Sequence, residues 1–220
     1  MLANNRTVSV ISAVMNRDER VIPAVENWKK IEGVDEIILL DWSSKNPIGE
    51  IDGVKVVRVD GEERWILTSA FNLAAEHASG DIMLKLDIDY RLEPDFLNRT
   101  KMKDTQFRHG SWRIVFEPND LHLAGFLMVK REDFWKVGGY NEKIVVYGHD
   151  DSELYNRLAA SGLEKVPITP LNGIKHIPHD YKSRHINQGG NYNPVPPPKF
   201  TGERILWYKN KDGNFERSRN

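Results

Sequence analysis

Two aspartates lie one residue apart in the first half of the chain. Asp87 and Asp89 follow the apolar residues 82–84. In an extended chain such a pair points to the same side, and two like charges side by side are unfavourable unless a cation lies between them. A solvated turn would more commonly carry Gly, Asn or Ser here. The pair therefore predicts a site for a hard cation, Mg²⁺ or Mn²⁺, that also contacts diphosphate oxygens.

A second pair of carboxylates, Asp150 and Asp151, opens a predicted amphipathic helix at 150–162. Acidic residues are common at helix N-termini, where free N–H groups and the helix dipole favour negative charge. The alternative is that one of the two carboxylates faces a cleft and acts as a general base. Glu153 and Arg157 are four residues apart and are expected to form an ordinary helix ion pair.

Two histidines, His176 and His179, flank the dipeptide Ile-Pro. A turn at Pro178 can bring both imidazoles to one ion. A single histidine near a strand end is more often structural, so that alternative stays open. The usual cysteine and histidine spacing of a tetrahedral zinc site is not met.

Composition excludes several classes of protein. The 220 residues include 31 basic and 32 acidic side chains, and this balance argues against a general nucleic-acid binder. The chain has no cysteine, which excludes disulfides, thiolate metal sites and a cysteine nucleophile. No signal-peptide pattern opens the sequence, and no apolar run approaches the ~18 residues of a membrane span. We expect a cytoplasmic α/β protein with no membrane span.

The elements that must position these residues alternate along the first half. Apolar runs predict buried strands, and 3.6-residue periodicity predicts helices between them. This alternation indicates a mostly parallel sheet with helices on both faces, in which ligands bind beyond the carboxyl ends of the strands. The pairs Asn16-Arg17 and Asp41-Trp42 lie at such ends. Strands are expected at 7–14, 36–41, 54–60 and 81–87, and helices at 17–31 and 67–78.

The second half is less regular. We expect strands at 111–117 and 122–130 and a short helix at 131–139. The Gly-, Asn- and Pro-rich segment 189–200 reads as a linker or a mobile loop before a mildly cationic tail. Residues 1–188 are therefore expected to form the main domain, with 189–220 as loop and tail.

Three further side chains near the predicted strand ends have more than one interpretation. Arg17 and Lys85 can offset phosphate charge, or they can be ordinary surface charges. Lys85 lies inside a predicted strand beside the acidic pair, where surface charge is the weaker explanation. Trp42 can form an aromatic platform for a sugar or base, or it can pack in the core.

Four stretches taken together resemble a known family. They are "AVMNR" after the first strand, "EIILLDWSSKNP", "SAFNLAAEHASGDIMLKLDIDY" and "FWKVGGYNEKIVVYGHDDSELYNRL". In this order they resemble the inverting family 2 glycosyltransferases with the GT-A fold. The later part is also similar to the C-terminal half of β-1,4-galactosyltransferases and to chondroitin-polymerase domains. The resemblance covers about residues 7–185.

The resemblance implies roles for individual residues. Asp41 would contact the base or ribose of a nucleotide-sugar, Asp87 would lie near the ribose and the metal shell, and Asp89 would bind the metal directly. Asp151 matches the catalytic base, and Asp150 would hydrogen-bond the acceptor. Here the chain has Asp150 where the family usually has Glu, which keeps the charge but shortens the reach.

The resemblance also extends to the metal shell. In galactosyltransferases a Met and a His three residues apart complete it, and His176 and His179 have that spacing, with His in place of Met. Residues 1–92 would then form the nucleotide-sugar half and 93–188 the acceptor half.

These features predict a metal-dependent inverting glycosyltransferase. It would use Mn²⁺ or Mg²⁺ and a nucleoside-diphosphate sugar, with a UDP-sugar expected, and a carbohydrate or glycoconjugate acceptor. A sugar-phosphate nucleotidyltransferase is the first alternative, but "AVMNRDER" lacks the Gly-rich loop that such enzymes usually carry after the first strand. A non-catalytic nucleotide-sugar- or glycan-binding module is the second, although it would need no base.

Overall fold

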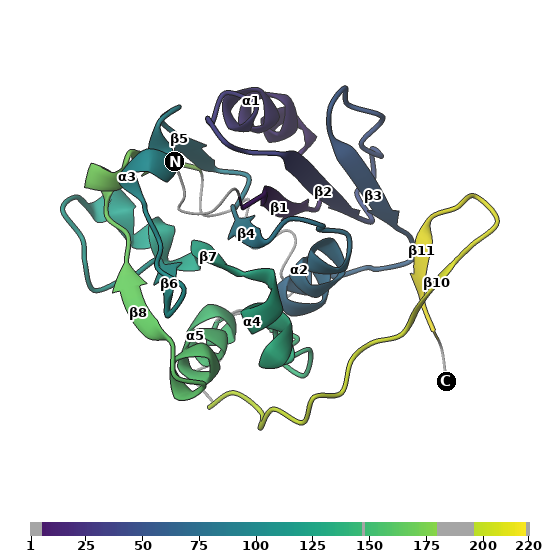
Figure 1. Ribbon diagram of the computed structural model, residues 1–220. Coiled ribbons are helices and arrows are strands. Elements are labelled where there is room, and N and C mark those ends of the chain that lie inside the picture. Colours follow the sequence, from purple (N-terminus) through teal and green to yellow (C-terminus); the bar gives the residue numbers. More distant parts are fainter. Residues whose placement is uncertain (1–5, 147, 180–195, 219–220) are drawn as a thin grey trace.

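The computed structural model describes residues 6–146, 148–179 and 196–218, and in this part of the chain the core is a nine-stranded mixed sheet. Its order is β10-β11-β3-β2-β1-β4-β7-β6-β8 (Figure 1). The first four strands along the chain lie next to one another and are parallel, as the alternation of apolar runs and helices predicts. They are β1 (Val8–Val14), β2 (Glu36–Trp42), β3 (Lys55–Val59) and β4 (Ile82–Lys85).

The other half of the sheet is mixed. β7 (Leu127–Lys130) runs antiparallel to both β4 and β6 (Gln106–His109), and β8 (Glu164–Pro167) is parallel to β6. A separate two-stranded sheet joins β5 (Tyr90–Leu92) to β9 (Ile174–His176). This second pairing brings the segment after β4 beside a segment more than eighty residues later.

Helices cover both faces of the large sheet. Helix α1 (Asp18–Trp28) packs on one face, and α2 (Leu67–Glu76), α4 (Arg131–Lys136) and α5 (Asp150–Ala160) lie on the other (Figure 1). Alternate side chains of each central strand enter opposite layers, which is why these strands read as continuous apolar runs. No helix in the described residues is long and apolar enough to cross a membrane.

Short helices complete the fold around the mixed half of the sheet. Helix α3 (Phe96–Arg99) follows β5. The 3₁₀ helices η1 (Pro118–Gly125) and η2 (Pro170–Asn172) precede β7 and β9, respectively. Because η1 directly precedes β7, it lies at the same end of the sheet as the carboxyl end of β4.

The C-terminal segment adds the last two strands. β10 (Trp207–Lys209) and β11 (Phe215–Arg217) form a hairpin, and β11 pairs in parallel with β3, which makes β10 the edge strand (Figure 1). The Trp207 ring packs edge-on against Trp42 with centroids 5.4 Å apart. Most of the segment 189–200, which the sequence interprets as a linker or mobile loop, lies outside the described residues, and the domain division stays a prediction.

Two predicted strands differ from the structure. The stretch 111–117 forms turns, and Trp112 and Phe116 are exposed, because the position beside β7 is taken by the preceding segment, β6. The predicted strand 122–130 begins only at Leu127, since the residues before it belong to η1. In both places the apolar pattern is present, but the described residues form turns or a 3₁₀ helix instead of a strand.

Candidate active site

The site residues gather where the central parallel strands end. β1 and β4 pair with Ile11 beside Lys85, and Leu86 donates its backbone N–H to Ile11 O at 3.0 Å. The chain then leaves the sheet, so Asp87 and Asp89 lie beyond its carboxyl edge. This is the location at which parallel α/β sheets bind ligands.

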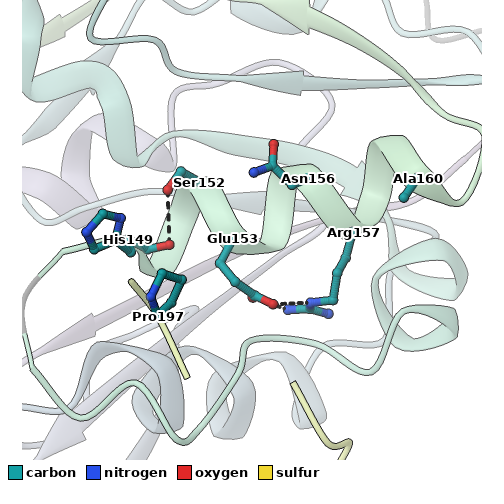
Figure 2. A pocket seen from close by; sticks show the side chains of 7 residues that line it. All are labelled: His149, Ser152, Glu153, Asn156, Arg157, Ala160 and Pro197. Carbon is teal, nitrogen blue, oxygen red and sulfur yellow. Dashed lines mark hydrogen bonds and ion pairs between the residues drawn. The ribbon is translucent and has the colours of Figure 1, made fainter. Parts of the chain in front are cut away.

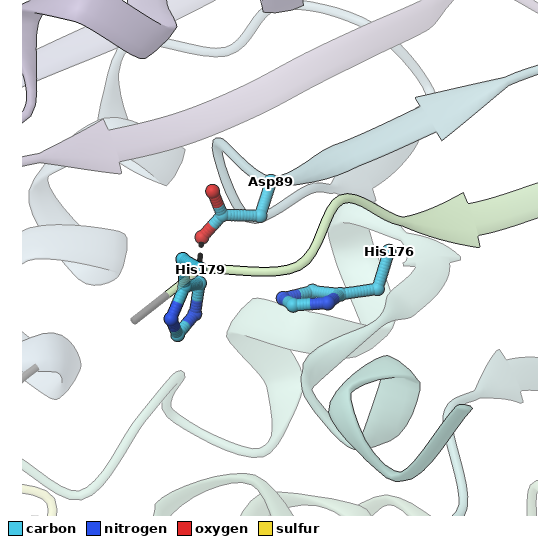
Figure 3. Close-up of side chains that lie close together, drawn as sticks. All are labelled: Asp89, His176 and His179. Carbon is cyan, nitrogen blue, oxygen red and sulfur yellow. Dashed lines mark ion pairs between the residues drawn. The ribbon is translucent and has the colours of Figure 1, made fainter. Parts of the chain in front are cut away.

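The structure brings three of the four predicted metal ligands together. Asp89, His176 and His179 each offer one ligand atom, and these atoms lie within 4.8 Å of one another (Figure 3). His179 Nε2 is 3.5 Å from Asp89 Oδ2. The register of the small sheet explains the convergence, because Tyr90 next to the aspartate pairs with His176. Asp87, the fourth predicted ligand, is not part of this cluster.

Asn119 of η1 fixes the His176 residue from two sides. Its Nδ2 donates to the His176 carbonyl at 2.7 Å, and its Oδ1 lies 3.0 Å from His176 Nδ1. If the amide oxygen accepts the Nδ1 proton, Nε2 is the nitrogen that could bind a metal. No local sequence pattern connects Asn119 to a histidine 57 residues later, so the sequence does not predict this contact.

Two arginines neutralise Asp89. Arg17 donates from Nη1 and Nη2 at 2.7 and 2.9 Å, and Arg20 donates from Nη1 at 2.7 Å. Arg17 thus lies beside Asp89 and contacts a carboxylate, and its expected role of offsetting phosphate charge stays a prediction. Arg20 was missed, and the available signal was its position one helical turn after Arg17 at the start of α1.

The donor set of the Asp89 cluster fits a divalent ion. A carboxylate and two imidazoles suit Mn²⁺ and related metals, and Mg²⁺ prefers oxygen donors. The side chain of Asp89 is 4% exposed, so its charge needs the cations around it. The described residues that could hold a metal here are therefore Asp89, His176 and His179.

A second polar cluster lies under the N-terminus of α5. Lys85 Nζ is 3.1 Å from Asp87 Oδ1 and 3.4 Å from Asp151 Oδ1, and it donates to Gly125 O at 2.6 Å. The Tyr140 hydroxyl donates to the same Asp151 oxygen at 2.8 Å. The acidic pair of β4 and the acidic helix start are therefore linked through one lysine.

Both aspartates at the start of α5 hold protons more tightly than usual. Burial and the neighbouring Asp151 raise the pKa of Asp150 to about 7. Burial also raises the pKa of Asp151, and Lys85 opposes this shift by favouring the charged form. A carboxylate with a raised pKa is a better proton acceptor than an ordinary surface aspartate.

Asp41 and Trp42, predicted to contact the nucleotide, are fully buried. Asp41 bonds Arg58 and accepts the backbone N–H groups of Ser44 and Ile48, each at 3.0 Å. Trp42 donates its indole N–H to Arg64 O at 2.9 Å. These contacts hold the loop after β2 in place. Direct contact of Asp41 or Trp42 with a nucleotide stays a prediction.

Asn16 connects the ends of β1 and β2. Its side chain accepts the Lys45 N–H at 2.8 Å, and its backbone N–H donates to Ser44 Oγ at 2.9 Å. Asn16 and Ser43 both have φ of 54°, a left-handed conformation that non-glycine residues rarely adopt. Such backbone strain is often found at binding sites, and both residues lie at the predicted ligand edge.

A separate pocket lies along one side of α5. The Glu153–Arg157 ion pair, predicted from its spacing, crosses it with a contact of 2.7 Å, and Ser152 Oγ donates to His149 O (Figure 2). Neither Asp150 nor Asp151 lines this pocket, which places it apart from the two clusters. Its lining is His149, Ser152, Glu153, Asn156, Arg157, Ala160 and Pro197.

Comparison with protein families gives one match. Residues 116–185 match the model described as the N-terminal domain of galactosyltransferase. The matched segment contains Asn119, the acidic start of α5 and both histidines. No curated protein sequence matches the chain significantly.

Solved structures share the fold at low sequence identity. The Drosophila β1,4-galactosyltransferase 7, solved with manganese, UDP-Gal and xylobiose, is 14% identical with a TM-score of 0.66, covering 96% of this chain and 92% of its own. The mannosyltransferase PcManGT from Pyrobaculum calidifontis, solved with GDP-Man and Mn²⁺, is 20% identical with a TM-score of 0.58. The match covers 76% of this chain and 55% of PcManGT.

GalNAc-T7, solved with UDP, GalNAc and Mn²⁺, is 17% identical with a TM-score of 0.65, over 86% of this chain and 46% of that one. The shared architecture extends across both halves of the sheet. The α/β fold expected from the sequence is confirmed, and the chain has the GT-A fold of the glycosyltransferases.

Proposed function

We propose that the protein is a metal-dependent inverting glycosyltransferase. It would transfer a sugar from a nucleoside-diphosphate sugar, with a UDP-sugar as the expected donor, to a hydroxyl of a carbohydrate or glycoconjugate. The observation that carries the proposal is the convergence of Asp89, His176 and His179 at the sheet edge where Asp151 also lies.

The metal cluster would bind the donor diphosphate. Asp89, His176 and His179 would hold Mn²⁺ or Mg²⁺, which when bound neutralises charge on the diphosphate leaving group. Arg17 and Arg20 would add positive charge to the same region and favour the anionic donor. The solved relatives that hold Mn²⁺ together with UDP-Gal or GDP-Man support this assignment.

Asp151 would act as the general base. Its contacts with Tyr140 and Lys85 both use Oδ1, so Oδ2 remains for the acceptor hydroxyl. The hydroxyl has a pKa far above neutrality and must lose its proton as it attacks the sugar carbon. A single base without an enzymic nucleophile gives direct displacement and inversion. Asp150 would hydrogen-bond the acceptor.

Two other functions are weaker. A sugar-phosphate nucleotidyltransferase would need phosphate-binding backbone after β1, and the chain has "NRDER" there, with Arg17 and Arg20 directed to Asp89. A non-catalytic binding module would need no buried proton acceptor, yet the pKa values of Asp150 and Asp151 are raised. The expected cytoplasmic location stays a prediction that cell fractionation can check.

A donor-hydrolysis screen tests the proposal. Wild-type protein is incubated with UDP-, GDP- and dTDP-sugars in Mn²⁺ and, in parallel, in EDTA. We expect hydrolysis of at least one donor in Mn²⁺ and none in EDTA. Donor binding in calorimetry without turnover, with xylobiose or water as acceptor, would instead support the binding module.

A further inference from the structure

Lys85 has an unusual position for a lysine. It is the last residue of the central strand β4, and its side chain is 1% exposed. Its neighbours on the strand, Met83 and Leu84, are equally buried and apolar. Burying an ammonium group is strongly unfavourable unless the charge is paired and the N–H groups are bonded. An apolar residue would be the ordinary choice for strand stability, so Lys85 requires another explanation.

The surroundings satisfy the ammonium group completely. Its three donors have the Gly125 carbonyl and one oxygen each of Asp87 and Asp151, and Nζ also lies 4.4 Å from the centre of the Phe71 ring. Burial disfavours the charged form, but the two carboxylates outweigh this effect and raise the pKa of Lys85 above its usual range. Lys85 therefore carries its charge between the two acidic motifs.

We propose that Lys85 is a positioning residue that aligns the base with the metal-binding turn. With the Tyr140 hydroxyl it holds Oδ1 of Asp151, which directs Oδ2 toward the acceptor, and it ties this carboxylate to Asp87 in the turn that carries Asp89. This inference rests on the proposed function. It also revises the sequence-based expectation, in which Lys85 offsets the charge of the donor phosphates.

Gly125 supports the close packing of this connection. A Cβ atom at this position would lie 2.8 Å from Asp87 Oδ2 and 3.1 Å from Lys85 Nζ. A side chain at this position would therefore push the ends of the Asp87 and Lys85 side chains aside, and glycine leaves them in place. The Gly125 carbonyl also accepts the shortest Lys85 hydrogen bond, so Gly125 lies beside both Lys85 and Asp87.

The charge of Lys85 affects the protonation of Asp151. Loss of the ammonium group would leave burial and neighbouring negative charge unopposed, and the pKa of Asp151 would rise further. A base must be deprotonated to act, so the acidic limb of the pH–kcat profile would move to higher pH. The titratable groups that face Asp151 are Lys85 and Asp87 from β4 and its turn, Tyr90 from β5, Tyr140 before α5, and Asp150 and Tyr155 from α5.

The test compares Lys85→Met with Lys130→Met. Lys130 is a matched control, because it also ends a strand and pairs with two carboxylates, Glu132 and Asp133, but it lies at the opposite end of the sheet. Turnover is measured with UDP-galactose and GDP-mannose in Mn²⁺, and affinity for UDP or GDP with Mn²⁺ is measured by calorimetry. Lys85→Gln, which keeps N–H donors without the charge, replaces Lys85→Met if that variant does not fold.

We expect Lys85→Met to lower kcat by roughly 10²-fold, the cost of a misplaced catalytic group, with nucleotide affinity within about twofold of wild type. The acidic limb should shift upward, and Lys130→Met should match wild type in all three measurements. A tenfold weaker nucleotide affinity with unchanged kcat would overturn the proposal and assign Lys85 to the donor phosphates.

A second readout needs no turnover. The ¹³C carboxyl resonance of Asp151, identified by its loss in Asp151→Asn, is titrated in wild type and Lys85→Met. We expect the midpoint to move to higher pH in the variant, and an unchanged midpoint would contradict the inference. If wild type turns over no donor, the proposed function fails while this titration still decides the role of Lys85.

Discussion

The two polar clusters of the site are built from different chemistry. Asp89 is surrounded by positively charged and metal-ligating groups, two arginines and two histidines. Asp151 receives one lysine and one tyrosine hydroxyl and lies next to a second carboxylate. The first arrangement is one that could hold a cation. The second arrangement is buried, and burial raises the pKa of Asp151 and raises that of Asp150 to about 7.

The clusters also differ in how they are assembled. Asp89 meets its histidines through the pairing of β5 with β9, and it meets its arginines through the start of α1. Asp151 is positioned at the first turn of one helix over the end of one strand. Substitutions in the first cluster should therefore change metal binding, and substitutions in the second should change turnover or acceptor binding without changing metal binding. The predictions below test this separation.

Removal of Asp89 should have the largest effect. Asp89→Ala removes the carboxylate of the metal cluster, and we expect loss of Mn²⁺ binding in calorimetry together with all divalent-dependent activity. Asp89→Asn, which keeps the shape, should behave in the same way because an amide oxygen carries no charge for the ion. Asp95→Ala, at a surface ion pair with Arg99, serves as the control. Unchanged Mn²⁺ affinity in the Asp89 variants would remove this residue from the metal site.

Asp151→Asn should reduce turnover next most strongly. Loss of a positioned base costs a factor of about 10²–10⁴, and the similar shape of Asn should preserve donor and Mn²⁺ affinity. Asp150→Asn should mainly raise the acceptor KM. Steady-state kinetics on both variants separates these outcomes. A larger fall of kcat in Asp150→Asn would exchange the two roles, and two unimpaired variants would mean that this is not the catalytic pair.

The histidines should show an intermediate effect confined to the metal. His176→Ala and His179→Ala should each raise the Mn²⁺ concentration for half-maximal rate, because each removes one ligand. Asn119→Ala should act in the same direction, by about 10-fold or more, since outer-shell partners of ligating histidines typically contribute 10–100-fold. Titration of Mn²⁺ by electron paramagnetic resonance measures binding directly. Metal dependence identical to wild type in both histidine variants would make these residues structural.

The last prediction concerns stability as a function of pH, with no effect on metal binding. The pKa of Asp150 is about 7 in the folded protein and near ~3.9 in an unfolded chain. The folded state therefore binds the proton more tightly, and its free energy of unfolding should fall as pH rises from about 4 to 7. Urea unfolding at several pH values in EDTA should show a flatter profile for Asp150→Asn. An equal slope in both proteins would contradict the raised pKa.

Local sequence patterns were sufficient to predict the parallel half of the fold. The apolar runs that became β1 to β4 and the periodic segments that became α1 and α2 each depend on neighbouring residues and on burial between two helix layers. The stretch 111–117 has the same apolar character but forms no strand. The position beside β7 is occupied by β6. Which of two apolar segments pairs with a given strand is decided by tertiary contacts, which local sequence patterns do not contain.

The candidate site shows the same division. The spacings of Asp87 and Asp89 and of His176 and His179 predicted four metal ligands. Three of these four residues, all except Asp87, come together in the structure. Asn119 acts on His176 from 57 residues away, so no local pattern marked it, whereas Arg20 carried a local signal in its position one helical turn after Arg17. Asp41 and Trp42 occupy the predicted strand end, yet the Arg58 pair and the packing of Trp207 bury them in the core. The burial of Asp41 and Trp42 depends on segments distant in sequence, so it could not be predicted from the residues around them.

The most direct test of the account is proton NMR of donor consumption by the wild-type protein. An α-linked donor, UDP-galactose or GDP-mannose, is incubated with Mn²⁺ or with EDTA, and the anomeric signals of the released or transferred sugar are followed from the first minutes. The account predicts consumption only with Mn²⁺ and initial appearance of the β-anomer. Consumption that is equal in EDTA, or initial appearance of the α-anomer, would contradict a metal-dependent inverting transferase.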